Sequence, residues 1–153
     1  MATNRTAVDA APEAVWAVLA NAQEYPRWVV GAKGIRAVDG RWPEPGSRFH
    51  HSIGLGPLTL QDNTECLLAD PPTHLVLEAR GRPLGRARIE LTLTPVGTGT
   101  DVVTEVVMDE VVVSPPLLRL LSSVIDPVTS LRNAESLRRL RGVVRSAGVT
   151  PPA

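Results

Sequence analysis

The sequence predicts an α+β fold in which a curved, seven-stranded antiparallel sheet wraps around a long C-terminal helix. Between residues 34 and 109, short stretches that alternate apolar and polar side chains are separated by turn residues, which is typical of an antiparallel meander. After about residue 114 the apolar residues recur at three- and four-residue steps, which is typical of an amphipathic helix. A sheet of this size cannot be covered by one edge contact, so we expect it to curl around that helix.

Size and charge predict one domain, spanning residues 1–150, and disfavour some partners. The chain has 153 residues, of which 43% are apolar and 21% charged, a composition that can bury one substantial core. Sixteen basic residues balance sixteen acidic ones, which disfavours generic nucleic-acid binding. No apolar run approaches the roughly 20 residues of a membrane helix, and the N-terminus lacks a signal-peptide pattern. Cys66 is the one cysteine, which fits a reducing compartment, and together these features lead us to expect a cytoplasmic location.

Two short helices should follow the first strand. Residues 4–9 fit a short strand, and Pro12 is then well placed as the first residue of a helix, where its missing N–H costs nothing. Residues 21–25 fit a further turn, and helix propensity ends between Pro26 and Gly31. The apolar face of the first helix is formed by Val15, Trp16, Val18 and Leu19.

The meander that follows should contain six strands. Turn residues such as Asp39-Gly40, Pro45-Gly46 and Asp70 to Pro72 separate them. The predicted ranges are 34–38, 47–54, 58–68, 74–80, 85–95 and 100–109.

The C-terminal helix should begin at Ser114 and Pro115, which fit a cap and first residue, and should kink or break briefly near Pro127. Its predicted core face is Leu117, Leu121, Val124, Val128, Leu131, Ala134, Leu137 and Val144. Its solvent face carries Arg132, Arg138, Arg139, Arg141 and Arg145. Such a cationic surface either holds an acidic partner or is simply solvated.

A sheet that curves around a helix encloses space, and this sequence has few large side chains to fill it. The aromatic residues are Trp16, Tyr25, Trp28, Trp42 and Phe49. Incomplete filling would leave a cavity lined by Val, Leu, Ile and Ala, which favours an apolar ligand that a few polar groups fix in place.

The order of these elements, with the stretches YPRWVVG at 25–31, WPEPG at 42–46 and RNAESL at 132–137, resembles the SRPBCC superfamily over nearly the whole chain. That superfamily has the helix-grip fold and includes START lipid-binding domains, polyketide cyclases and aromatases, coenzyme Q-binding proteins and pollen-allergen-like hydrophobic carriers. Within it, the sequence is similar to the bacterial branch labelled polyketide cyclase/dehydrase. The resemblance implies the fold strongly and the reaction weakly, because one scaffold hosts carriers, sensors and enzymes, and it supplies no catalytic motif.

Strand parity identifies polar side chains that should point into the enclosed space, because successive strand residues face opposite sides of a sheet. His51 shares the apolar face of Ile53, and Asp62 shares that of Leu60. A hairpin through residues 54–57 that pairs Ile53 with Leu60 therefore places His51 opposite Asp62. The same register places Phe49 opposite Thr64.

The predicted His51–Asp62 pair allows three roles: catalysis, contact with a ligand, or a purely structural pair. A carboxylate beside an imidazole holds its tautomer and raises its basicity, which suits proton abstraction next to a carbonyl or a hydrogen bond to a ligand. His50 faces the opposite side and His74 begins a later strand, so no metal site is predicted, and no cofactor. Cys66 should behave as a small buried hydrophobe.

Other residues are expected to line the ligand site because they share the inward parity of their strands or the predicted face of the last helix. They are Trp28, Phe49, Ile53, Leu60, Thr64, Leu77, Ile89, Leu91, Thr104 and Leu131. Trp28 and Trp42 either stack on a flat ligand or pack in the core. In the last strand we expect Thr104, Val106 and Met108 to face inward; the opposite parity would bring in Glu105 as an acid or base.

Three functions fit these expectations. The first is binding of a small hydrophobic molecule, such as a lipid, a quinone or an aromatic polyketide, without chemistry. The second is a polyketide cyclase or dehydratase that uses His51 as general base, oriented by Asp62. The third is a protein-interaction module that uses the Arg-rich final helix, for a partner that the sequence does not identify.

Overall fold

One seven-stranded antiparallel sheet forms the main layer of the molecule, in the order β1-β7-β6-β5-β4-β3-β2. The computed structural model describes residues 1–55, 57–81, 85–97, 102–113, 116, 120 and 122–148. The strands are β1 (Ala2–Val8), β2 (Ala32–Asp39), β3 (Arg48–Leu55), β4 (Leu58–Asp70), β5 (His74–Gly81), β6 (Gly85–Val96) and β7 (Val103–Val113). The predicted meander is confirmed. The predicted start of its last strand lies outside the described residues, and its end extends from residue 109 to Val113.

Short helices follow β1, as predicted. Helix α1 (Pro12–Leu19) has its proline in the first turn, and a 3₁₀ turn, η1 (Ala22–Glu24), leads into α2 (Tyr25–Trp28). Helical structure therefore continues through Pro26, which lies in the first turn of α2 where no backbone N–H is needed. The long helix α4 (Ser122–Gly148) contains Pro127 in its interior, and its predicted start at Ser114 lies outside the described residues.

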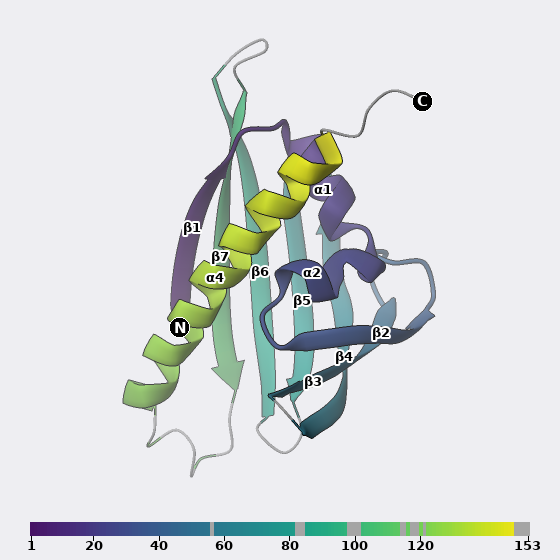
Figure 1. Ribbon diagram of the computed structural model, residues 1–153, viewed down its shortest axis with the longest axis vertical. Coiled ribbons are helices and arrows are strands. Elements are labelled where there is room, and N and C mark those ends of the chain that lie inside the picture. The colour runs from purple at the N-terminus through teal and green to yellow at the C-terminus, as the bar shows by residue number, and fades with distance from the viewer. Residues whose placement is uncertain are drawn as a thin grey trace.

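The long helix lies across the concave side of the sheet, as Figure 1 shows. It packs against β1 at the sheet edge and against α1 and α2. Figure 1 also shows β2 and β3 running across the direction of β5, β6 and β7, so the sheet bends strongly between its two edges. This bend encloses the space beneath α4 and α2.

The hydrophobic core lies under the C-terminal half of α4. Leu137 and Leu140 are fully buried there, and Val143 and Val144 continue the same face. They pack with buried residues of the sheet and of α1, among them Val8, Val15, Leu91, Leu93 and Val106. Leu140 and Val143 fill the seven-residue gap in the predicted apolar series between Leu137 and Val144.

The predicted core face of α4 is wrong in its N-terminal half. Val124, Val128 and Leu131 are 62%, 61% and 73% exposed, and Ala134 is exposed as well. Leu117 and Leu121 lie outside the described residues. Among the described residues of the predicted face, Leu137 and Val144 are buried.

Polar residues face the sheet in this half of the helix instead. Asn133 and Ser136 are each 2% exposed. The Ser136 hydroxyl accepts a hydrogen bond from the Val30 backbone N–H at 3.1 Å, and the Asn133 side chain donates to Glu110 at 2.7 Å. These bonds hold the polar side of α4 inward, and the apolar residues on its other side are left facing outward.

Candidate ligand-binding site

A cavity of about 490 Å³ lies between the sheet and the N-terminal half of α4, with α2 closing one side. Its apolar lining is Trp28, Val29, Val30, Ala32, Ile53, Leu60, Leu77, Ala79, Ala87, Ile89, Met108, Val112 and Ile125. Its polar lining is Tyr25, His51, Asp62, Glu110, Thr129, Arg132, Asn133 and Ser136. Arg80 and Arg86 border it near the ends of β5 and β6, although their guanidinium groups pair with Glu78 on the other face of the sheet. The volume falls within the range of roughly 300–1,000 Å³ that is usual for small-molecule sites.

Small side chains on the sheet leave this space open. Ala79 on β5 lies directly opposite Ala87 on β6, and both line the cavity. Ala32 on β2 adds a third small residue to the wall. The expected underfilling is therefore present, and it comes from alanines in the sheet as well as from the scarcity of aromatic residues.

The β3–β4 hairpin has the predicted register. His51 pairs with Asp62, Ile53 with Leu60, and Phe49 with Thr64. The side chains of His51 and Asp62 share the concave side, and the two residues are 1% and 6% exposed. The sequence therefore located two buried polar residues at the cavity wall.

The expected increase in the basicity of His51 is wrong. Burial, and after it the positive charges of Arg36 and His50, together lower the pKa of its imidazole to about 4. The Arg36 guanidinium donates to the backbone carbonyls of both His51 and Asp62, each at 3.3 Å, which places this charge close to the His51 backbone. His51 is therefore neutral at neutral pH.

The hydrogen bonding of His51 also differs from a dyad oriented by Asp62. Its Nε2 forms a hydrogen bond with the Thr64 hydroxyl at 3.0 Å. Its Nδ1 is buried and has no hydrogen-bond partner among the residues that the structure describes. The Asp62 carboxylate accepts the backbone N–H of Asn63 at 2.7 Å. Thr64 thus fixes one ring nitrogen, and the other is buried without a partner among the described residues.

Tyr25 is a site residue for which the sequence assigned no role. Its ring lies 5.5 Å from the His51 ring, centroid to centroid, and 4.6 Å from that of Phe49. Burial raises the pKa of its phenol to about 12, an increase that a hydrogen bond with Thr64 and the charge of Arg132 partly oppose. The phenol is therefore uncharged at neutral pH.

A buried polar cluster joins α4 to β7 at the cavity. Glu110 is 3% exposed and accepts hydrogen bonds from Arg132 Nη2 at 2.7 Å and from Asn133 Nδ2 at 2.7 Å. Arg132 was expected on the solvent face, but its guanidinium turns to Glu110. Glu110 continues the inward parity of Thr104, Val106 and Met108, which is the parity we expected. It was missed because the predicted strand ended one residue before it.

Half of the predicted lining residues border the cavity: Trp28, Ile53, Leu60, Leu77 and Ile89. Phe49, Thr64, Leu91 and Thr104 are instead fully buried in the core. The Thr104 hydroxyl, for example, donates to the Ala10 carbonyl at 2.6 Å. Leu131 lies on the exposed side of α4, so its expected place in the site is wrong.

Other candidate residues have structural roles. Trp42 packs edge-on against Phe49, and its indole N–H donates to the Leu19 carbonyl at 3.1 Å. Glu105 pairs with Arg5 at 3.3 Å, away from the cavity. Cys66 is fully buried, and burial raises the pKa of its thiol to about 11, so it is inert as a nucleophile.

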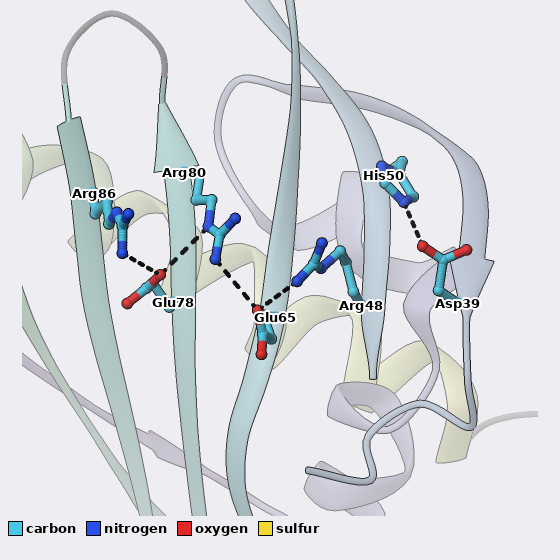
Figure 2. A network of polar contacts seen from close by, with 7 residues as sticks. All are labelled: Asp39, Arg48, His50, Glu65, Glu78, Arg80 and Arg86. Atoms are coloured by element: carbon cyan, nitrogen blue, oxygen red, sulfur yellow. Dashed lines mark hydrogen bonds and ion pairs between the residues drawn. The ribbon is translucent and has the colours of Figure 1, made fainter. Parts of the chain in front are cut away.

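The opposite face of the sheet carries paired charges, as Figure 2 shows. A chain of ion pairs there links Arg48, Glu65, Arg80, Glu78 and Arg86 across β3 to β6. His50 pairs with Asp39 at 2.7 Å, and this separate pair is also drawn in Figure 2.

Within the described ranges, no group of three or more His, Cys, Asp or Glu side chains is placed to hold a metal ion. Nor does any described helix have the length and hydropathy to cross a membrane.

A family model described as polyketide cyclase/dehydrase and lipid transport matches residues 2–145 of this chain. The chain belongs to this family. The match confirms the resemblance to the SRPBCC superfamily that the sequence predicted. No curated protein matches the chain.

Solved structures share the family fold. A conserved protein from Geobacillus kaustophilus superposes with a TM-score of 0.73 at 15% identity, with 95% of each chain covered. A protein from Rhodobacter sphaeroides gives a TM-score of 0.69 at 22% identity, with 94% of this chain and 91% of that chain covered. A protein from Thermus thermophilus gives 0.69 at 13% identity, with 95% and 97% covered. At these identities the likeness extends to the fold alone.

Proposed function

We propose that the protein binds a small hydrophobic molecule in the cavity and holds it by a hydrogen bond to Nδ1 of His51. The observation that carries this proposal is a buried ring nitrogen without a partner among the described residues, on a histidine that lines a largely apolar cavity of about 490 Å³. An unpaired buried polar atom costs about 1–3 kcal/mol, and a polar atom of a ligand would remove that cost. The family description, which includes lipid transport, agrees with a hydrophobic ligand.

The cyclase or dehydratase alternative is less well supported. The family description includes such enzymes, and His51 lies at the cavity. However, an imidazole with a pKa of about 4 is a weak base at neutral pH, and no carboxylate of the described residues holds its Nδ1. A neutral imidazole is better suited to hydrogen bonding than to proton abstraction.

The third function, protein interaction through the arginines of the last helix, has little support. Arg138 and Arg139 both pair with Glu135, and Arg145 pairs with Asp9. Arg132 pairs with Glu110. Charges that are already paired within the chain leave less attraction for an acidic partner.

Titration with Nile red, a neutral dye that fluoresces in apolar surroundings, tests the binding site. We expect saturable binding that the Ala79→Phe substitution abolishes, because a phenyl ring at this position fills the cavity from β5. Unchanged binding to Ala79→Phe would place the dye elsewhere, for example on the exposed apolar residues of α4, and would contradict the proposal.

The role of His51 is tested with the same dye, whose carbonyl can accept a hydrogen bond. We expect His51→Ala to weaken binding by about 1–2 kcal/mol, the contribution of one buried hydrogen bond. His50→Ala is the matched control, because it removes the same side chain from the neighbouring residue, which pairs with Asp39 outside the cavity. Equal losses in both variants would show that the effect does not come from the cavity.

A further inference from the structure

Arg132 is held at the cavity by one of its three guanidinium nitrogens. Its Nη2 donates to both carboxylate oxygens of Glu110 and, at 3.1 Å, to the side-chain oxygen of Asn133. Glu110 is 3% exposed, so this anchor point is fixed inside the protein. A guanidinium is planar and rigid, so holding Nη2 also restricts where Nη1 and Nε point.

The other two nitrogens of Arg132 remain unused in the part of the chain that the structure describes. Nη1 and Nε, which carry the remaining three N–H groups of a guanidinium, form no hydrogen bond there, and the side chain is 42% exposed. Arg132 lines the cavity, and its positive charge reaches the phenol of Tyr25, where it opposes part of the increase in pKa. This charge therefore acts on the interior of the cavity as well as on solvent.

We infer that Arg132 binds a carbonyl oxygen of the ligand through an N–H group of Nη1 or Nε. This inference rests on the proposed function, because it adds a polar contact on α4 to the same site and narrows the ligand to a hydrophobic molecule that carries a carbonyl group. A carbonyl that leaves water needs a new donor, and a charged donor forms a stronger hydrogen bond than a neutral one.

The two walls of the cavity differ in polarity, and this difference orients such a ligand. Thr129, Asn133 and Ser136 line the cavity from the same helix, on the wall formed by α4. The wall formed by β5 and β6 includes the small apolar residues Ala79 and Ala87. The carbonyl should therefore lie toward α4, and the hydrocarbon part should lie against these two strands.

The contact with Arg132 is separate from the contact with His51. Arg132 is anchored on β7 through Glu110, whereas His51 lies on β3, and three strands separate β7 from β3 in the sheet. A ligand with two polar groups can use both contacts. A ligand with one carbonyl should use Arg132, because the imidazole of His51 is neutral and the guanidinium is charged.

Two probes of nearly the same shape isolate the carbonyl: 1-acetylpyrene, which has one, and 1-ethylpyrene, which has none. Energy transfer from tryptophan to the pyrene ring measures the affinity of each. The informative quantity is the ratio of the ketone affinity to the hydrocarbon affinity, compared between the unaltered protein and its variants, because changes in cavity shape affect both probes alike. Failure of both probes to bind the unaltered protein would contradict the proposed function itself.

Two variants should change this ratio in opposite directions. Glu110→Gln/Arg132→Gln removes the guanidinium without leaving a buried carboxylate unpaired, so the ratio should fall about tenfold. Glu110→Gln alone keeps Arg132 and removes the charge that balances it, so the ratio should rise several-fold. An unchanged ratio in the double variant, or an unchanged or lower ratio in Glu110→Gln, would overturn the inference and leave the proposed function standing.

Two controls show where the carbonyl lies. Arg138→Gln makes the same substitution one and a half turns further along α4, at an arginine that pairs with Glu135 outside the cavity lining, and should leave the ratio unchanged. If the ratio instead falls in His51→Ala and not in the double variant, the carbonyl lies at His51, and the inference is wrong. Circular dichroism verifies that each variant is folded, and Glu110→Gln still decides the question if the double variant is not.

Discussion

His51 is a titratable side chain that is almost completely buried, and this burial makes folding sensitive to acid. The imidazole packs beside the rings of Tyr25 and Phe49, at centroid distances of 5.5 Å each, and hydrogen-bonds Thr64. These surroundings favour the neutral ring, while the positive charge of Arg36 opposes protonation further. In the unfolded chain the same side chain has the ordinary histidine pKa of 6.5.

We predict that His51 makes the protein less stable as the pH falls from 6.5 toward 4. In this interval the unfolded chain binds a proton that the folded protein does not, so the free energy of unfolding decreases with falling pH. With a folded pKa of about 4, the loss between neutral pH and about pH 4.5 is about 2–3 kcal/mol. The loss should be absent from His51→Gln, compared by urea denaturation at both pH values. A parallel pH dependence in the two proteins would show that His51 does not control it.

Thr64 fixes the imidazole, and we predict that it can be replaced by serine but not by valine. Thr64→Val keeps the shape and removes the hydroxyl, which leaves His51 Nε2 buried without a partner. We expect it to lower the free energy of unfolding by about 1–3 kcal/mol. Thr64→Ser retains the hydroxyl and should recover most of the hydrogen-bond contribution. A similar loss in both variants would point to packing of the Thr64 methyl group instead.

The position of His51 could be predicted from sequence, but its charge state could not. Alternation along a strand and one tight hairpin fix the face and the register, and these are local properties. The pKa depends on Arg36, which lies on a different strand with an irregular register at this point, and on how completely α2 covers the ring. Neither follows from alternation.

At the scale of the elements, α4 has two halves that do different things. Its C-terminal half closes the core with Leu137 and Leu140, whereas its N-terminal half faces the cavity with Thr129, Asn133 and Ser136. Apolar periodicity predicted the first half because burial in the core requires apolar side chains. It failed in the second because a helix that covers a cavity and bonds to Glu110 can turn its polar side inward. The sequence contains apolar residues on both sides of this half, and periodicity selected the exposed set.

We predict opposite responses to the same substitution in the two halves. Leu131→Asp should change the free energy of unfolding by less than about 1 kcal/mol, because Leu131 is 73% exposed. Leu137→Asp, six residues further along the helix and 1% exposed, should cost about 4 kcal/mol or more, because it buries a charge without a partner. Urea denaturation measures both. A large loss for Leu131→Asp would mean that α4 is rotated relative to the sheet.

At the scale of the whole molecule, the sheet and the long helix are joined in two ways. Apolar packing joins them at the C-terminal end of α4, and the Glu110–Arg132–Asn133 cluster joins them across the cavity. The first kind of contact was evident from composition and pattern. The polar cluster could not be predicted in this way. It requires a partly exposed arginine of one element to reach a buried carboxylate of another, and the spacing of residues along the chain does not indicate such a pair. The cavity lies where the apolar packing ends, so the polar cluster holds the two layers together at that point.

This arrangement predicts an asymmetric response to removing either partner of the ion pair. Arg132→Met leaves the Glu110 carboxylate, which is 3% exposed, buried with Asn133 but without a cation, and should cost about 3–5 kcal/mol. Glu110→Met leaves Arg132, whose side chain is 42% exposed and can turn to water, so the cost should be nearer 1–2 kcal/mol for the hydrogen bonds lost by Arg132 and Asn133. The double variant should be more stable than Arg132→Met alone, because no uncompensated charge remains inside. Equal costs for the two single variants, with no recovery in the double variant, would mean that Glu110 is solvated in solution and that the cavity is open to water on this side.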